Sequence, residues 1–258
     1  MFAKPISAPT TNSTPSGPLL SVARLNAGYG SKQILFDLDI EVGRGEIVVV
    51  VGPNGAGKTT LLSAISGLCR VFSGSVTFAA QDITRGRADR ITRRGLAHCP
   101  EGRHIFQRLT VEENLLAAHV RRTSRSFAEL RDHVFGLFPI LAERRHGLAS
   151  RLSGGQQQML AISRSLMAEP DLMILDEPSL GLAPKVITQI FAIVLDLALS
   201  GMSLLVVEQN VRLALEVGDR AYVLESGHVR LSGLAEEVAA HPALAGLYLG
   251  ADHLGPVA

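Results

Sequence analysis

One short stretch of the chain carries the pattern expected where a protein binds phosphate. The sequence GPNGAGKT, residues 52–59, matches G-x-x-x-x-G-K-[ST]. Its glycines allow a loop in which successive N–H groups point inward around phosphate oxygens, and a following helix directs its positive end at the same anion. Lys58 supplies an ammonium to the β- and γ-phosphates, and the Thr59 hydroxyl suits Mg²⁺. The predicted nucleotide-binding residues are Gly52, Pro53, Asn54, Gly55, Ala56, Gly57, Lys58, Thr59 and Thr60.

Two acidic residues end a second apolar run, LMILDE, residues 172–177. Asp176 at the carboxyl end of a strand can hold Mg²⁺ through water, and Glu177 can polarise a water in line with the γ-phosphate. An Asp-Glu pair alone is also an ordinary start of a helix or turn. With a phosphate loop upstream, we expect the pair to act in magnesium-dependent hydrolysis.

The stretch RLSGGQQQML, residues 151–160, narrows the class of phosphate-binding protein. Ser153 can cap a helix, and Gln156 at the third helical position completes a capping box. The intervening pair, Gly154 and Gly155, lowers helix stability and leaves the helix N-terminus bare of side chains. A well-capped helix does not need these glycines, so we expect a phosphate to approach this helix end.

The elements that must position these residues alternate between strands and helices. Three continuous apolar runs indicate strands covered on both faces, as in a parallel sheet, and GLAHCPE is a weaker fourth candidate. The runs are residues 46–52, 171–177 and 202–208, and the fourth is 95–101. Helical patterns cover residues 58–67, 111–120, 127–141, 154–168 and 184–199.

Further patterns complete the predicted α/β fold. Residues 19–30 and 33–42 alternate as antiparallel strands that turn at Gly28 and Gly30, and residues 220–233 form a hairpin that turns at Ser226-Gly227. Several helices without a strand among them, between residues 101 and 171, indicate an inserted helical subdomain at about 103–168. The prediction is a P-loop ATPase core with a mostly parallel sheet, an antiparallel β subdomain and this helical insert.

Composition bounds the remaining possibilities. The chain has 258 residues, of which 47% are hydrophobic and 19% charged, and its net charge is +1. The apolar stretches are too short to span a bilayer, and the charge gives no electrostatic case for nucleic acid. Two cysteines, Cys69 and Cys99, have no metal spacing and indicate a reduced compartment. We expect one domain at 19–250, a disordered Pro- and Ser/Thr-rich tail at 1–18 and a short tail at 251–258.

The phosphate loop, LSGGQ and LMILDE together resemble the ATP-binding cassette (ABC) family of transport ATPases over nearly the whole predicted domain. The resemblance implies that two cassettes pair head to tail, so that each ATP lies between one phosphate loop and the partner's signature helix. Tyr29 matches the position that stacks on adenine, and the helical insert matches the face that receives membrane subunits. The signature residues, which act on the partner's ATP, are Leu152, Ser153, Gly154, Gly155 and Gln156.

Three departures from the family pattern indicate a subfamily. Glu101 replaces a glutamine that contacts Mg²⁺, Ala183 replaces an aspartate after the catalytic glutamate, and Gln209 replaces a histidine. Together they resemble the second ATP-binding subunit of branched-chain amino acid importers, whose relatives serve urea and short-chain amide uptake. The resemblance makes Glu177 and Gln209 catalytic and adds Glu101 to the metal ligands Thr59 and Asp176. Gln209 is expected to face the γ-phosphate, and Glu208 to be only a strand-end neighbour.

The implied protein uses ATP and Mg²⁺ at the cytoplasmic face of the plasma (inner) membrane, as a peripheral subunit. Its expected partners are a differing sister ATPase (a heterodimer is favoured), two membrane permeases and an extracytoplasmic solute-binding protein. The alternatives are a urea or amide importer, or a soluble cassette protein of ribosomes or DNA. The latter usually carries two cassettes or a long coiled-coil insert, for which we find no pattern. A GTPase is disfavoured because we find no Asn-Lys-x-Asp run to read guanine.

Overall fold

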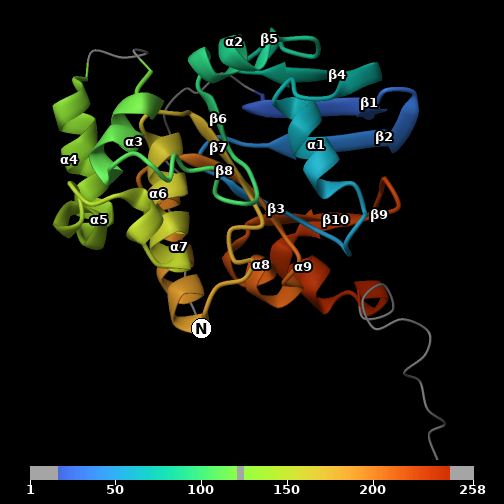
Figure 1. The fold of residues 1–258 in the computed structure, drawn as a ribbon. Coiled ribbons are helices and arrows are strands. Elements are labelled where there is room, and N and C mark those ends of the chain that lie inside the picture. The colour runs from blue at the N-terminus through green and yellow to red at the C-terminus, as the bar shows by residue number, and fades with distance from the viewer. Residues whose placement is uncertain (1–16, 121–124, 245–258) are drawn as a thin grey trace, which may run out of the picture.

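The computed structural model describes residues 17–120 and 125–244 (Figure 1). The expected tails at 1–18 and 251–258 therefore lie outside the described residues, apart from Gly17 and Pro18. Among the residues described, no helix is both long enough and apolar enough to cross a membrane.

A six-stranded sheet, in the order β10-β9-β3-β8-β7-β6, forms the centre of the molecule. Its neighbours from β9 to β6 are parallel, and only the hairpin β9–β10 is antiparallel. The predicted mostly parallel sheet is confirmed, including the weak candidate that became β6. The strands are β3 (Ile47–Val51), β6 (Leu96–Cys99), β7 (Leu172–Asp176), β8 (Ser203–Glu208), β9 (Arg220–Glu225) and β10 (His228–Leu234).

The central strands are apolar without alternation because both of their faces are buried. In β3, Ile47, Val49 and Val51 join one hydrophobic core, whereas Val48 and Val50 join the other. The same division separates alternate residues of β7 and β8. Helices of the insert and the C-terminal region lie on the first side, and the antiparallel sheet and α1 (Lys58–Ile65) lie on the second.

A four-stranded antiparallel sheet, in the order β2-β1-β4-β5, forms the second layer. The strands are β1 (Leu20–Tyr29), β2 (Lys32–Val42), β4 (Arg70–Phe78) and β5 (Gln81–Asp82). The turn falls at residues 30–31, so the expectation that Gly28 belongs to it was wrong: Gly28 is inside β1, paired with Gln33. The sequence pattern missed β4, in which Gly74 (φ 85°) and register shifts against β1 interrupt the alternation.

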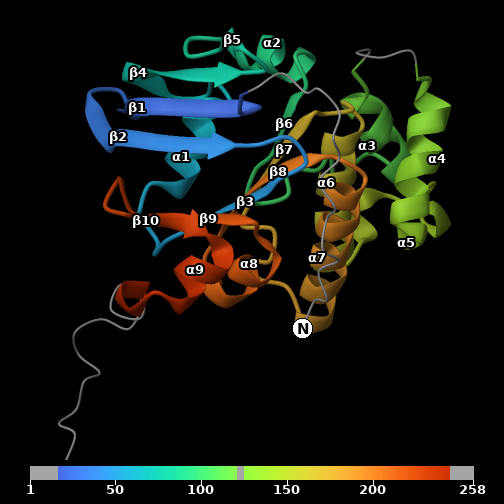
Figure 2. The same ribbon diagram turned by 180° about the vertical axis from the view of Figure 1, so that it is seen from behind.

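The helical insert lies beyond the β6 edge of the central sheet, as both views show (Figures 1 and 2). It contains α3 (Val111–Ala118), α4 (Phe127–Leu137), α5 (Pro139–Glu143), the 3-10 turn η1 (Ala149–Arg151) and α6 (Gly154–Leu166). The single helix expected over 127–141 is two helices. Its break follows from Pro139, which cannot continue α4 because it lacks an N–H and disfavours helical backbone at Phe138.

The remaining helices flank the sheet. They are α2 (Ala88–Arg93), α7 (Pro184–Leu199), α8 (Val211–Val217) and α9 (Ala235–Ala240). The predicted bounds of α7 are confirmed, whereas the short helices α2, α8 and α9 were not predicted.

The register of the central strands places the functional residues at one level, because Val51 pairs with Glu208 and Asp176 pairs with Val207. The ends of β3, β7 and β8 therefore meet at one edge of the sheet.

Candidate nucleotide-binding and hydrolysis site

The phosphate loop connects the end of β3 to α1, as predicted. Gly57 is the N-cap of α1 with φ 106°, and a Cβ there would lie 2.7 Å from Leu35 Cδ2, so only glycine fits. No side chain of the described residues caps α1, and no acidic residue occupies its first turn. The first N–H groups of the helix therefore remain available to an anion.

Lys58 is almost completely buried beneath this loop, with 5% of its side chain exposed. Its ammonium donates to the carbonyls of Gly52 (2.8 Å) and Pro53 (3.2 Å) and forms an ion pair with Glu177 Oε1 at 3.2 Å. A buried cation requires such partners. The loop therefore holds Lys58 in place, and the ion pair joins the loop to the end of β7.

Asp176 ends β7 with both carboxylate oxygens buried and without a hydrogen-bond partner among the described residues. Burial raises the pKa of Asp176 to about 6, the charges of Glu177 and Glu101 add to the rise, and the charge of Lys58 opposes it. Unpartnered buried oxygens are unfavourable in the absence of a cation. They fit Mg²⁺, which binds through one or two carboxylates together with substrate phosphates and waters.

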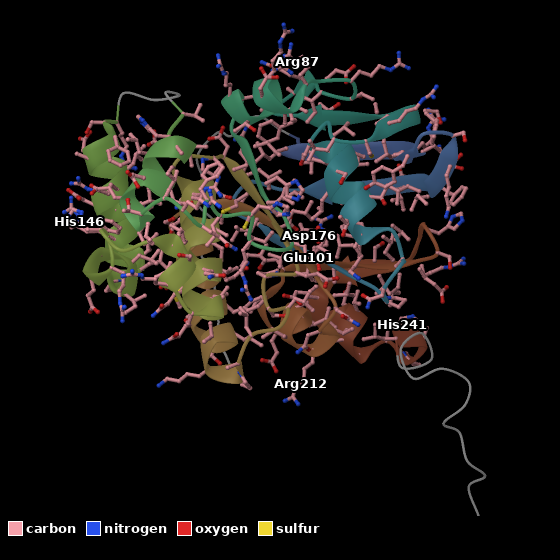
Figure 3. All side chains as sticks on the ribbon, viewed as in Figure 1. Arg87, Glu101, His146, Asp176, Arg212 and His241 are labelled. Atoms are coloured by element: carbon pink, nitrogen blue, oxygen red, sulfur yellow. The ribbon has the colours of Figure 1, made fainter. Side chains whose placement is uncertain are left out.

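Few side chains among the described residues could serve as metal ligands near Asp176. Within residues 17–120 and 125–244, no group of three or more His, Cys, Asp or Glu side chains could hold a metal by itself. Thr59 and Glu101 are both exposed and line one cleft, which is described below. Figure 3 shows Glu101 and Asp176 close together near the centre of the molecule. This donor set suits a metal whose coordination is completed by a nucleotide.

Glu177 has an unusual backbone conformation. Its φ of 46° lies in the left-handed region, where non-glycine residues are uncommon and are held by their surroundings. The Glu177 N–H donates to the Val207 carbonyl at 2.9 Å, which ties the loop after β7 to β8. This geometry directs the carboxylate at Lys58.

A cleft of about 570 Å³ brings together most of the predicted nucleotide-binding and catalytic residues. Tyr29, the phosphate loop, Glu101, Glu177 and Gln209 all line it, although they come from five separate segments. Tyr29 is 49% exposed, and its hydroxyl donates to Ser63 Oγ at 3.4 Å. An exposed ring at the rim of the cleft is available to a planar base.

The signature stretch, Leu152–Gln156, is not part of this cleft. Its predicted capping box is confirmed: the Gln156 N–H donates to Ser153 Oγ (3.3 Å) and the Ser153 N–H to Gln156 Oε1 (3.0 Å). A contact within the chain explains one of the two glycines, Gly155. A Cβ on Gly155 would lie 2.6 Å from Val186 Cγ1 on α7, so the expectation that only an approaching phosphate accounts for Gly155 was wrong.

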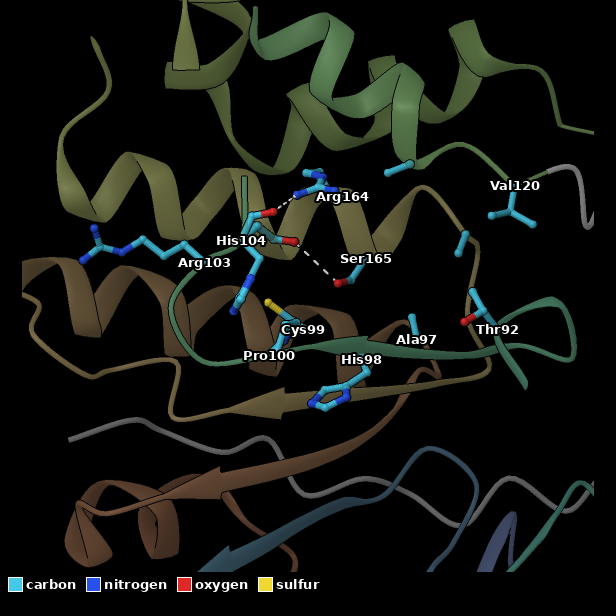
Figure 4. A pocket seen from close by; sticks show the side chains of 13 residues that line it. Thr92, Ala97, His98, Cys99, Pro100, Arg103, His104, Val120, Arg164 and Ser165 are labelled. Carbon is cyan, nitrogen blue, oxygen red and sulfur yellow. Dashed lines mark hydrogen bonds between the residues drawn. The ribbon is translucent and has the colours of Figure 1, made fainter. Parts of the chain in front are cut away.

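The segment after Glu101 is attached to α6, which the sequence did not reveal. Arg103 (φ 67°) and His104 (φ 46°) are consecutive left-handed residues. The Arg103 guanidinium donates to Gln157 Oε1 at 3.1 Å, and Arg164 donates to the His104 carbonyl (Figure 4). A cavity of about 260 Å³ lies between β6 and α6 at this point, where burial lowers the pKa of His98 to about 4.

Two further polar residues, Asn114 and Glu208, are fully buried, and the sequence indicated the contacts of neither. Asn114 on α3 accepts the Phe106 N–H (2.8 Å) and donates to the Phe106 carbonyl (2.9 Å), which fixes the path of this segment. Glu208 is 1% exposed and accepts from the Ser179 N–H (2.9 Å) and hydroxyl (2.8 Å). It is more than the strand-end neighbour that was expected. A carboxylate at the end of an apolar strand was the available signal.

The α/β core, the phosphate loop and the Asp-Glu strand end define a nucleotide-hydrolysing cassette. The family model described as "ABC transporter" matches residues 35–180. The chain belongs to the ABC transporter family and is an ATPase. Cassettes of this family bind nucleotide and generally pair with permease subunits in membrane-associated assemblies.

Two curated relatives and one solved structure show how far the likeness extends. The high-affinity branched-chain amino acid transport ATP-binding protein BraG of Pseudomonas aeruginosa is 43% identical, over 90% of this chain and 100% of that protein. The probable branched-chain amino acid transport ATP-binding protein LivF of Archaeoglobus fulgidus is 40% identical, over 90% of this chain and 99% of that protein. The crystal structure of a nucleotide-free ATP-binding cassette from an ABC transporter superposes with a TM-score of 0.80 at 26% identity, and the match covers 90% of this chain and 99% of that chain.

The contact between Gly155 and Val186 generates a stability prediction. Gly155→Ala should lower the free energy of unfolding by about 1–3 kcal/mol through overpacking, because β-branched Val186 has little freedom to move. Adding Val186→Ala should restore most of the loss. Gly154→Ala is the matched control, since its nearest neighbour is the flexible end of Arg103. Urea unfolding measures the stability of the parent and the three variants. Equal stability of Gly155→Ala and Gly154→Ala would contradict the packing explanation.

Proposed function

We propose that this chain is the energy-coupling ATPase of an importer for branched-chain amino acids. Two observations support the solute class: two relatives at 40–43% identity over 90% of the chain are named as branched-chain amino acid transport proteins, and the chain departs from the family pattern at Glu101, Ala183 and Gln209. A urea or short-chain amide importer is the alternative, because the resemblance includes those relatives. In this proposal residues 19–250 form one cassette, with the insert at about 103–168.

The chemical roles follow from the cleft. Lys58 exchanges the Glu177 carboxylate for phosphate oxygens, which frees Glu177 to orient and deprotonate the attacking water. Thr59, Asp176 and Glu101 hold Mg²⁺, which when bound neutralises charge on the phosphates. Gln209 lines the cleft as a neutral amide that donates to the γ-phosphate and does not ionise. The 3.2 Å ion pair between Lys58 and Glu177 is the observation that carries this assignment.

The assembly completes the site. We place a differing sister cassette head to tail against this one, with residues 152–156 meeting the sister's ATP. The exposed Ser153 and the location of the signature outside its own cleft support this arrangement. Two permeases contact the helical insert and the adjoining cavity beside β6, on the cytoplasmic face of the membrane. An extracytoplasmic solute-binding protein delivers the solute to the permeases.

The first test concerns binding. Lys58→Ala should weaken ATP binding by at least tenfold, about 1.4 kcal/mol, because it removes the buried cation at the phosphates. Lys185→Ala, which removes an exposed lysine on α7, is the control. Equilibrium titration with a fluorescent ATP analogue measures both. An affinity for the Lys58 variant within about threefold of the parent would remove Lys58 from this role.

The second test separates binding from hydrolysis. Glu177→Gln should slow turnover in the assembled transporter by about 10²–10⁴-fold, because an amide cannot accept the proton of the water. ATP affinity should equal or exceed that of the parent, since Lys58 loses a competing carboxylate. The exposed Glu236→Gln on α9 is the control. Turnover of Glu177→Gln at the parent rate would show that another group is the base.

The third test concerns the partner. The purified cassette should be a weak ATPase alone, because Glu101, Ala183 and Gln209 alter three helper positions at once. Mixing with a candidate sister cassette should raise the ATPase rate and, in the presence of ATP, the molecular mass measured by light scattering. In the control, the Lys58→Ala variant of this cassette replaces the parent in the mixture with the sister cassette. Full activity of this cassette as a homodimer would contradict the heterodimer.

A further inference from the structure

Glu208 is a buried charged residue at the site to which the chemistry above gives no task. It is the last residue of β8 and is 1% exposed, although the rest of the strand is apolar from Leu204 onward. Both of its oxygens accept hydrogen bonds from Ser179, which lies two residues after Glu177 in the loop. The carboxylate therefore contacts the catalytic loop without lining the cleft.

The bonds to Ser179 are the reason that a carboxylate is tolerated in this position. Burial raises the pKa of Glu208, which the bonds from Ser179 and the Asn210 backbone oppose. The nearby Glu177 adds like charge. A buried carboxylate is unfavourable unless its lone pairs are used, and replacing buried charges by well-packed apolar residues is often neutral or stabilising. The presence of Glu208 at this position is therefore best explained by its bonds to the loop.

The two bonds close a clamp around the backbone of Glu177. On one side, the Glu177 N–H donates to the Val207 carbonyl at 2.9 Å. On the other, Ser179 is held by the next residue of the same strand, Glu208, at 2.8 and 2.9 Å. Pro178 between them contributes a fixed φ. With both flanks attached to β8, Glu177 keeps its left-handed φ of 46° and its carboxylate stays 3.2 Å from Lys58.

We propose that Glu208 is a positioning residue for ATP hydrolysis, which acts by holding Ser179 so that Glu177 is aimed at the attacking water. This inference rests on the role proposed above for Glu177. Because Gln209 follows Glu208 directly and lines the cleft, Glu208 connects the Glu177 loop to the segment that carries Gln209.

Three variants test the clamp. Glu208→Leu removes both bonds to Ser179, together with the bond from the Asn210 backbone, at similar volume. Glu208→Gln keeps them, since its carbonyl accepts the Ser179 N–H and its amide donates to Ser179 Oγ. Ser179→Ala removes only the hydroxyl bond. Ser203→Ala is the matched control, because Ser203 is a buried residue at the opposite end of β8 that accepts the Gly45 N–H at 2.9 Å, away from the cleft.

The expected result, measured in the assembled transporter, is a split between kcat and KM. Glu208→Leu should lower kcat by about tenfold or more through misplacement of Glu177, with KM for ATP within about twofold of the parent. Glu208→Gln should restore kcat to within about threefold. Ser179→Ala should lower kcat in the parent background and have no further effect in Glu208→Leu, as coupled residues do.

Several outcomes would overturn the proposal. A parent-like kcat for Glu208→Leu, or additive effects of the two substitutions, would show that the clamp does not position Glu177. If Ser203→Ala lowers both Tm and kcat as much as Glu208→Leu does, the loss of kcat reflects a general loss of strand stability instead. If Glu208→Leu does not fold, a parent-like kcat for Ser179→Ala is decisive. Glu177→Gln, assayed in parallel, shows separately whether the role proposed for Glu177 is itself wrong.

Discussion

Burial of both faces of the central strands is the constraint on which the rest of this structure depends. Strands β3, β7 and β8 lie between two hydrophobic cores, so their interiors admit no polar side chain. Polar residues can appear only where these strands end, and parallel strands end together at one edge. The register places Val51 beside Glu208 and Asp176 beside Val207. This register brings the polar residues at the ends of the three strands close together.

Four charged side chains, Lys58, Asp176, Glu177 and Glu208, are consequently crowded at a poorly solvated edge. The Lys58 ammonium and the Glu177 carboxylate neutralise each other, and Glu208 is satisfied by Ser179. Asp176 alone has oxygens without partners among the described residues, and burial raises its pKa to about 6. A net negative, incompletely satisfied site of this kind favours binding of a cation together with its phosphate, because neither charge is stable there without the other.

The sequence predicted the features that depend on local pattern. Continuous apolar runs identified β3, β7 and β8, and the Ser-x-x-Gln spacing identified the capping box at Ser153. Features that depend on contacts between distant residues were missed: Gly155 meets Val186, and Glu208 meets Ser179, 29 residues away. The strand β4 was missed because bulges at Gly74 break its alternation. Pro139 was a visible helix breaker whose effect on 127–141 was underestimated.

The segment that follows Glu101 joins the cleft to the helical insert. Glu101 comes two residues after the end of β6, where Cys99 pairs with Leu175, and therefore lies at the level of Asp176 and Glu177. Arg103 then bonds to Gln157 on α6, and Asn114 on α3 holds Phe106 from both sides. Since α6 begins with the signature residues, Glu101 and the signature helix share one set of attachments. These hydrogen bonds connect the segment after Glu101 directly to the insert, outside the two closely packed hydrophobic cores.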